Sequence, residues 1–250
     1  MPARTAPFEK VADGVYLLAR ANVNCYLVVS DRAITLVDGG LPGTWPVLKA
    51  ALASIGATTD DIDAIVLTHG HFDHVGMCDR LSHEHHRPIH VHESDREMVR
   101  HPYRYPHERP RWQYPFRYPR SIPILAGMVA SGAIGIKGIQ ASGDVRSGVA
   151  LPGGLIPVPS PGHTPGHYGF FLEKQGVLFA GDAVVTLDPY TGETGPRIVA
   201  GAATADRATA LEGLDAYVAT GAQLVLTGHG APFDGGIGQA VRLARAAGVR

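Results

Sequence analysis

Short hydrophobic runs recur along the chain and alternate with amphipathic stretches. Three runs near the start, Val15 to Leu18, Asn24 to Val29 and Ile34 to Val37, are separated by polar or turn-forming residues. Their length and content of β-branched and aromatic residues predict three strands of an antiparallel meander. A fourth run, Ile62 to Leu67, contains no glycine or proline and is typical of a buried strand.

Apolar residues at helical spacing follow these strands. Residues 42–56 place Trp45, Leu48 and Leu52 on one face and end at Gly56, a common helix stop. Four more covering helices are expected at 74–87, 94–100, 205–219 and 237–247. Strands that alternate with helices in both halves predict an α/β fold with two sheets and helices outside them.

Size and composition are compatible with one domain. The chain has 250 residues, of which 45% are hydrophobic and 18% charged, enough for one large core. Its 22 basic and 23 acidic side chains create no global field for nucleic acid or an anionic membrane, so such partners would need local evidence.

The location is expected to be cytoplasmic, without a membrane partner. Met1 to Lys10 has no apolar core of signal-peptide length, and no stretch approaches the roughly 20 apolar residues of a spanning helix. Two cysteines, Cys25 and Cys78, make no disulfide framework and are expected to be buried and reduced.

The segment Thr68 to His74, with the sequence THGHFDH, directly follows the predicted strand at 62–67. Side chains alternate along an extended segment, so His69 and His71 project to one side, and the following turn can bring Asp73 and His74 beside them. Imidazoles and a carboxylate are suitable ligands for a borderline-soft divalent cation.

Three later candidates have the same context. His163 lies in the turn-rich sequence PGHTPGH, Asp182 ends the run 177–181, and His229 ends the run 224–228. Each lies where a hydrophobic strand gives way to a glycine-containing turn, so all could meet at one edge of the sheets. Asp38 also follows a predicted strand and is a candidate acceptor for the ring N–H of a ligand histidine.

A second histidine cluster competes with this interpretation. No later segment matches it, so its members are predicted to be surface residues at a helix end and on a strand. They are His83, His85, His86, His90 and His92.

The order H-x-H-x-D-H, then PGHTPGH, GD and TGH, resembles the metallo-β-lactamase superfamily over nearly the whole chain. The resemblance implies a four-layer αβ/βα sandwich, two mixed β-sheets flanked by helices, as a single domain spanning 1–250. It also implies two groups of ligands with one bridging residue between them. His69, His71 and His163 would hold one ion, Asp73, His74 and His229 the second, and Asp182 would bridge both.

The same resemblance implies the chemistry. Two zinc ions would share a hydroxide that attacks a small ester, thioester or lactone, with Asp73 and Asp182 as catalytic residues and weak β-lactam turnover as a side activity. Iron and manganese remain alternative metals. Asp182 stands where β-lactamase subclasses have cysteine or serine, so the ligand set is more similar to thioesterases of the glyoxalase II type and to acyl-homoserine lactonases.

Some features leave other functions open. Val185 stands where lactonases carry a tyrosine, and Tyr190 lies nearby in a different register. No helical C-terminal domain of the glyoxalase II kind follows His229. The alternatives are a mononuclear iron persulfide dioxygenase and a nucleic-acid-processing phosphodiesterase or binding module.

Residues 101–123 differ from the rest of the chain because aromatic residues, arginines and six prolines alternate there. The prolines exclude a long helix, and the aromatic content argues against disorder. The resemblance suggests a lid over the metals. A subunit contact in a homodimer ranks second and a nucleic-acid platform last. The apolar stretch 122–139 is either a wall for an acyl chain or a short core helix.

Overall fold

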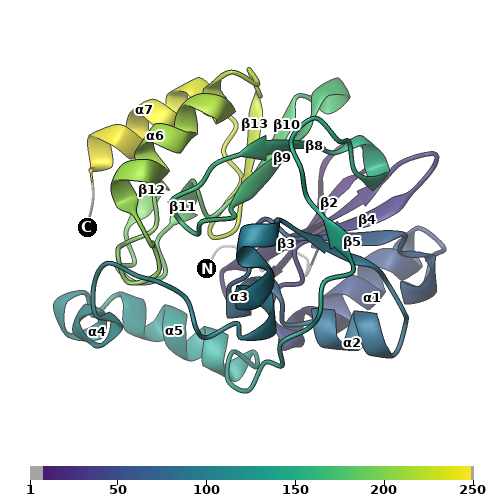
Figure 1. Ribbon diagram of the computed structural model, residues 1–250, viewed down its shortest axis with the longest axis horizontal. Coiled ribbons are helices and arrows are strands. Elements are labelled where there is room, and N and C mark those ends of the chain that lie inside the picture. The colour runs from purple at the N-terminus through teal and green to yellow at the C-terminus, as the bar shows by residue number, and fades with distance from the viewer. Residues whose placement is uncertain (1–7, 249–250) are drawn as a thin grey trace, which may run out of the picture.

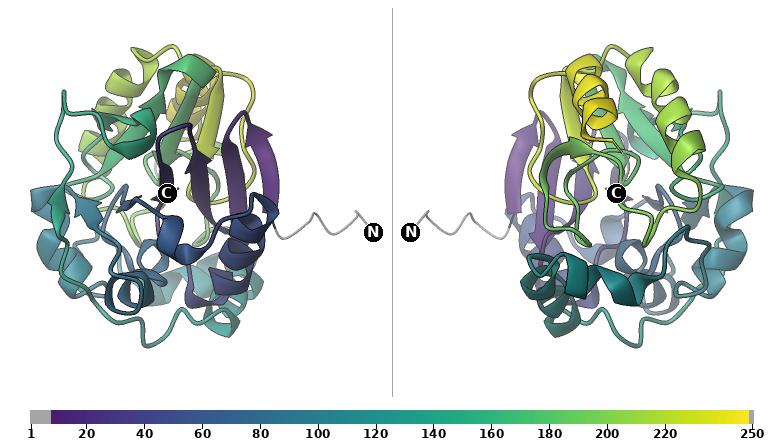
Figure 2. Two further views of the ribbon diagram at one scale, coloured as in Figure 1. Left: turned by 90° about the vertical axis from the view of Figure 1, so that its right-hand side faces the viewer. Right: turned by 90° about the vertical axis from the view of Figure 1, so that its left-hand side faces the viewer.

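Two β-sheets face each other at the centre of the protein, and helices cover their outer sides in the computed structural model, which describes residues 8–248 (Figures 1 and 2). The first sheet has seven strands that lie side by side in chain order. Its first four strands pair antiparallel and the last three extend it in parallel. The strands are β1 (Phe8–Ala12), β2 (Val15–Arg20), β3 (Val23–Val29), β4 (Ile34–Val37), β5 (Ala64–Val66), β6 (Ile89–Val91) and β7 (Gly143–Asp144).

The second sheet has four strands in the order β13-β10-β9-β8. Strands β10 and β13 run parallel, whereas β8, β9 and β10 pair antiparallel. A separate hairpin joins two short strands beyond this sheet. These strands are β8 (Ile156–Pro159), β9 (Tyr168–Leu172), β10 (Val177–Gly181), β11 (Val185–Leu187), β12 (Thr194–Arg197) and β13 (Leu224–Thr227).

Helices form the two outer layers. Side chains of α1, α2 and α5 pack on the outer face of the first sheet, and side chains of α6 and α7 pack on the second. No helix among residues 8–248 combines the length and apolar character needed to cross a bilayer. The helices are α1 (Trp45–Ser54), α2 (Cys78–His83), α3 (Arg96–Arg100), α4 (Tyr114–Arg117), α5 (Ser121–Ala130), α6 (Arg207–Val218) and α7 (Ile237–Ala247).

The inner core fills the space between the two sheets. Tyr26 and Val66 of the first sheet meet Phe170, Phe179 and Leu226 of the second, and all five side chains are almost fully buried. The Tyr26 and Phe179 rings pack edge to face at 5.3 Å between centroids, a favourable aromatic geometry. The predicted α/β sandwich of two mixed sheets flanked by helices is therefore confirmed.

Most sequence-based strands are confirmed. The three runs at 15–18, 24–29 and 34–37 became β2, β3 and β4, and the run at 62–67 contains β5. Strand β1 was not predicted because it lies at the sheet edge and its burial pattern lacks fully buried positions. Of the N-terminal stretch Met1 to Lys10, positions 1–7 lie outside the described residues.

The helix predicted over 74–87 is wrong in its extent, because α2 covers only Cys78–His83. At its start Gly76 packs so closely on Gly40 and Pro42 that an added Cβ would lie 2.5 Å from the Gly40 carbonyl oxygen. His74 is part of a 3₁₀ turn, Phe72–His74. At its end His86 has a φ of 54°, which a regular right-handed helix does not allow.

The segment 101–123 contains the 3₁₀ turn Arg111–Gln113, the short helix α4 and the first three residues of α5, and no long helix, as its prolines predict. The apolar stretch that follows forms α5 and a loop. Met128 and Ile136 are buried in the core, whereas Ile122, Val129 and Ile134 are at least half exposed. This stretch is thus a short helix with only one covered side.

Removing an inner-core ring should destabilise the fold. Phe170 is fully buried between the sheets, so Phe170→Ala should lower the free energy of unfolding by about 3–5 kcal/mol in urea denaturation. Phe116→Ala is the matched control, because Phe116 is 84% exposed and its loss should change stability by less than about 0.5 kcal/mol. Equal effects of both substitutions would contradict the assigned core.

Candidate metal centre

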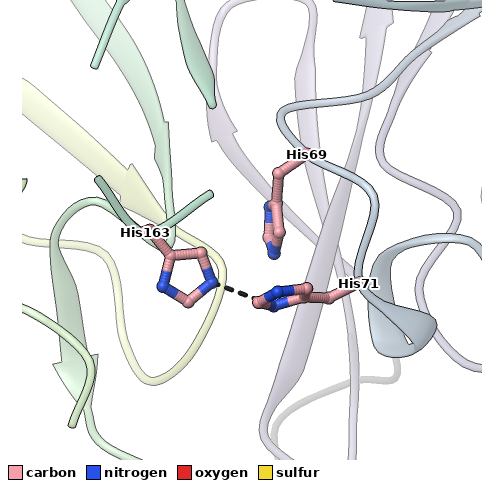
Figure 3. A group of neighbouring side chains, drawn as sticks. All are labelled: His69, His71 and His163. Atoms are coloured by element: carbon pink, nitrogen blue, oxygen red, sulfur yellow. Dashed lines mark hydrogen bonds between the residues drawn. The ribbon is translucent and has the colours of Figure 1, made fainter. Parts of the chain in front are cut away.

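The rim of the sandwich collects the ends of four strands. Asp182 follows β10 and His229 follows β13; because these strands are parallel neighbours, their carboxyl ends lie at the same edge. His69 and His71 follow β5 of the opposite sheet, and His163 lies in the turn after β8. Figure 3 shows the rings of His69, His71 and His163 converging from the two halves of the molecule.

The seven residues singled out in the sequence lie together. Their ligand atoms form three overlapping groups within 4.8 Å: His69 with His71 and His163, His69 with His74 and Asp182, and Asp73 with His74 and His229. The first and third groups have the membership that the resemblance implies. Their role as metal ligands stays a prediction, but their proximity is a structural finding.

Asp182 lies between the two outer groups. Its Oδ2 is 3.6 Å from His163 Nε2 and 3.2 Å from His229 Nε2, and its Oδ1 is 3.5 Å from His74 Nε2. On the other side, His229 Nε2 is 3.3 Å from Asp73 Oδ2. Ligands bound to one tetrahedral zinc lie about 3.3 Å apart, so these spacings suit such an ion.

Several of these atoms lack a partner although they are buried. His69 Nε2, His74 Nε2 and Asp182 Oδ1 form no hydrogen bond, and no residue of the group is more than 5% exposed. Buried polar atoms normally have partners, and a cluster of imidazoles and carboxylates without one is costly. The donor set and its unsatisfied atoms therefore fit divalent cations.

The surrounding protein fixes which ring nitrogen carries the proton. His229 Nδ1 lies 2.9 Å from the Asn22 carbonyl, which can only accept, so this nitrogen donates. His163 Nδ1 donates to Thr204 Oγ1, whose own proton goes to the Val199 carbonyl. In both rings Nε2 is therefore the nitrogen that faces the centre.

Asp38 fixes the proton position of two further histidines. It contacts His74 directly, as the sequence analysis expected, and acts on His69 through Thr68. Its Oδ2 accepts from His74 Nδ1 at 3.0 Å and from Thr68 Oγ1 at 2.9 Å. Because the Thr68 hydroxyl donates to Asp38, it can accept from His69 Nδ1, which lies 3.0 Å away. One buried carboxylate thus orients both rings and leaves their Nε2 atoms for an ion.

His71 is turned the other way. Its Nδ1 lies 3.0 Å from His163 Nε2, while its own Nε2 is buried without a partner. Since the His163 proton is on Nδ1, its Nε2 accepts from His71 Nδ1, and His71 would have to move this proton to Nε2 to offer Nδ1 to a shared ion. The Tyr105 ring packs on His71 at 3.8 Å between centroids and holds this orientation.

The pKa shifts of the histidines differ between the two outer groups of the site. Burial lowers the pKa of His69 and His71 well below the usual range, and lowers that of His163 to about 4 although Asp182 opposes it. For His229, burial is outweighed by Asp182 and Asp73, which raise its pKa to about 10. A cation on the His229 side must therefore displace a proton, which couples its binding to pH.

Asp182 carries the negative charge of the centre. Burial alone would raise its pKa, but His229 and His74 hold the pKa of Asp182 well below its usual range. The same carboxylate, with Asp38, raises the pKa of His74 against the effect of burial. The chain thus keeps a charged oxygen ligand in a buried position.

A hydrogen-bond chain that the sequence analysis did not assign positions Asp182. The Asp182 backbone N–H donates to His167 Nε2 at 3.1 Å. His167 Nδ1 then donates to Ser160 Oγ, Ser160 to Tyr217 Oη, and Tyr217 to the Ala180 carbonyl. Each donor in this buried chain of hydrogen bonds has one acceptor. The sequence feature that could have pointed to His167 is its place as the second histidine of PGHTPGH.

Asp95 is a second residue that the sequence analysis missed. It is fully buried, and it accepts hydrogen bonds from the Gly70 and Gly166 backbone N–H groups and from Thr164 Oγ1 at 3.1, 2.8 and 2.6 Å. Gly70 lies between two candidate ligands, and Thr164 follows His163. Asp95 therefore ties together the two loops that form the first group.

Two tyrosines and two apolar side chains roof the centre. Tyr105, Tyr190, Leu125 and Met128 line a cavity of about 10 Å³ that also contacts Asp73, a volume near the smallest that holds one water. Burial raises the pKa of Tyr105 to about 12 and also raises that of Tyr190. Both phenols therefore keep their protons and can donate to an oxygen.

The remaining candidates lie outside the centre. The second histidine cluster joins no metal-capable group among residues 8–248; His83 and His86 are exposed, and His85 stacks on Trp45. His90 and His92 are half-buried rather than surface residues. Both cysteines are buried and free, as expected, and burial raises the pKa of the Cys78 thiol.

Comparison with known proteins gives concordant matches. The model of the metallo-beta-lactamase superfamily matches residues 18–229. The probable metallo-hydrolase YflN of Bacillus subtilis is 29% identical over 252 aligned positions, covering 92% of this chain and 88% of its own. The N-acyl homoserine lactonase AttM of Azorhizobium caulinodans is 26% identical over 230 positions, covering 82% and 80%. Among solved structures, the metallo-beta-lactamase family protein TTHA1429 of Thermus thermophilus gives a TM-score of 0.67 at 25% identity, covering 95% of this chain and 80% of its own.

Removing the Asp95 carboxylate should loosen both ligand loops. Asp95→Ala leaves three buried donors unsatisfied, so it should lower the free energy of unfolding by at least about 2 kcal/mol and weaken metal binding by about 10–100-fold. Chelator competition and urea denaturation measure both effects. Asp215→Ala is the control, because this carboxylate is 74% exposed and its ion pair with Arg245 contributes little. Wild-type metal affinity in Asp95→Ala would contradict the assigned role.

Proposed function

Because the chain belongs to the metallo-beta-lactamase superfamily, we propose that it is a metal-dependent hydrolase of a small ester, thioester or lactone. The observation that carries this proposal is the pair of buried ligand groups with Asp182 between them. The similarity to the lactonase AttM over most of both chains supports a carbonyl substrate of this kind.

The proposed cofactor is a pair of zinc ions, with iron or manganese as alternatives. Five imidazoles and two carboxylates are borderline donors that suit zinc. His69, His71 and His163 would hold one ion, and Asp73, His74 and His229 the other, with Asp182 shared. When bound, such a pair lowers the pKa of a water and polarises a carbonyl group.

Asp73 is the proposed proton carrier. It lines the cavity beside Asp182 and is 5% exposed, so it can reach a substrate without competition from bulk water. Its Oδ2 lies 3.3 Å from His229 Nε2, which orients the carboxylate. From there Asp73 can accept a proton from the nucleophile and pass it to the leaving group.

The roof of the cavity supports a substrate with a polar and an apolar part. Tyr105 and Tyr190 place two protonated phenols over the centre, with 3.4 Å between their oxygens, where they can donate to a substrate oxygen. Leu125 and Met128 offer an apolar wall beside them. This arrangement favours an acyl compound over a phosphodiester, whose negative charge an apolar wall does not satisfy.

The lid role of residues 101–123 is part of the proposal. Tyr105 of this segment packs on His71 and lines the cavity, so movement of the segment would admit a substrate. A single domain over 1–250 and a cytoplasmic location stay predictions from the sequence, as does weak β-lactam turnover.

Metal removal tests the proposal directly. The protein as purified should contain about two zinc ions per chain by elemental analysis. Dialysis against a chelator should abolish hydrolysis of an ester, thioester and lactone panel, and zinc should restore it. One iron per chain with oxygen consumption on glutathione persulfide would contradict hydrolysis and establish the dioxygenase alternative.

Replacing the Asp73 carboxylate should remove catalysis without unfolding the chain. Asp73→Asn keeps the size of the side chain but cannot carry the proton, so kcat should fall by about 10²–10⁴-fold. Asp215→Asn, at a largely exposed aspartate, is the control. Thermal denaturation and metal content are measured beside the rate, and wild-type turnover in Asp73→Asn would refute the assignment.

A further inference from the structure

The segment that roofs the centre also has an outer face. Its inner side, with Tyr105, Leu125 and Met128, lines the cavity. Its outer side belongs to the turn before α4 and to α5, which follow one another along the edge of the molecule in Figure 1. On α5 the cavity-lining Leu125 lies on the same helical stripe as Ile122 and Val129, so the segment reaches from the cavity to the exposed surface without a break.

Large apolar side chains are exposed on this outer face. Trp112 is 69% exposed and Phe116 is 84% exposed, and they are four residues apart, which places them on the same side of a helical turn. Ile122 and Val129 are 51% and 50% exposed and lie seven residues apart on one side of α5. We call these four residues the apolar patch.

Positive charge lies along the same segment as the apolar patch, between residues 104 and 120. Arg104, Arg109, Arg117 and Arg120 are exposed and form no ion pair with any residue between 8 and 248. Residues 101–123 contain five arginines and a single acidic residue, Glu108, which pairs with Arg207. The expectation of no membrane partner came from the absence of a spanning stretch and from the net charge of −1 for the whole chain, and that net charge conceals this local excess.

We propose that the apolar patch and its four arginines dock on an anionic lipid surface. Exposed Trp and Phe with aliphatic neighbours insert at the headgroup boundary, and surrounding arginines attract acidic lipids. A second copy of the chain fits less well, because a symmetric contact would bring the arginines of both copies together. A nucleic acid fits less well too, because Ile122 and Val129 offer no ring for base stacking.

The consequence for the protein is a link between lipid contact and access to the centre. The residues that touch the lipid and those that cover the cavity belong to one continuous segment, from Tyr105 to Val129. Docking of this segment on a lipid surface would place the roof of the cavity at the bilayer boundary, next to amphiphilic esters dissolved there.

Co-sedimentation with lipid vesicles tests the proposal on the full chain with its metals bound. The wild type should sediment with phosphatidylglycerol vesicles, remain in solution with phosphatidylcholine vesicles, and be released as salt rises. Phe116→Asp should reduce the partition coefficient on phosphatidylglycerol at least tenfold. Val149→Asp is the matched control, because Val149 is 57% exposed on a different loop and its substitution should leave partitioning unchanged.

A second pair of variants isolates the charge. Arg117→Gln with Arg120→Gln should reduce partitioning on phosphatidylglycerol at least threefold, whereas Arg242→Gln, at an exposed arginine of α7, should leave it unchanged. Thermal denaturation of each variant confirms that it is folded.

Several outcomes would overturn the proposal. They are failure of the wild type to bind phosphatidylglycerol vesicles, equal binding by Phe116→Asp and wild type, a dimer that Phe116→Asp dissociates, and retention of single-stranded RNA without retention of vesicles. Vesicle binding requires no turnover, so the proposed hydrolysis and the proposed docking can fail independently.

Discussion

The structure depends on the confinement of five imidazoles and two carboxylates within a few ångströms of one another, away from water. Such a cluster needs acceptors behind the nitrogens that do not face the centre, and four of the five histidines have one, whereas His71 Nε2 is buried without a partner. Asn22, Thr204, Thr68 and Asp38 supply those acceptors. The hydrogen bonds behind the seven clustered residues therefore determine the conformation of the rim loops as much as those residues do.

Close approach of the backbone is the geometric side of the same constraint. A Cβ on Gly228 would lie 2.0 Å from Asp182 Oδ1, so only glycine lets the strand end before His229 pass behind the Asp182 carboxylate. Gly181 has a φ of 51°, a left-handed conformation that glycine adopts readily, and it turns β10 so that Asp182 faces inward. Strand ends with glycine beside the functional residue thus allow ligands from two sheets to converge.

The sequence predicted the parts of this arrangement that depend on local pattern. Strands β2 to β4 and the helix at 237–247 follow from hydrophobic periodicity, and the seven clustered residues follow from their position after buried strands. Asp95 and His167 escaped prediction because their roles come from contacts between distant loops: Asp95 binds Gly70 and Thr164, and neither spacing nor propensity encodes that pairing. The helix at 74–87 was overestimated because tertiary packing at Gly76 overrides a continuous helical pattern.

In the proposed function the centre and its roof would contribute different parts. The clustered residues would hold the ions that activate water and polarise an oxygen, and many bonds satisfy that chemistry. Choice among those bonds requires groups that contact the rest of a substrate, and the cavity offers Tyr105, Leu125 and Met128 of one segment and Tyr190 of the loop after β11. Tyr105 packs on His71 and also lies under the Arg111 guanidinium at 3.9 Å, so the roof is coupled to the ligand shell through a single ring. In the proposed function, a displacement of this segment that admits substrate would therefore free one face of the His71 ring, which would make substrate entry and the state of the centre interdependent.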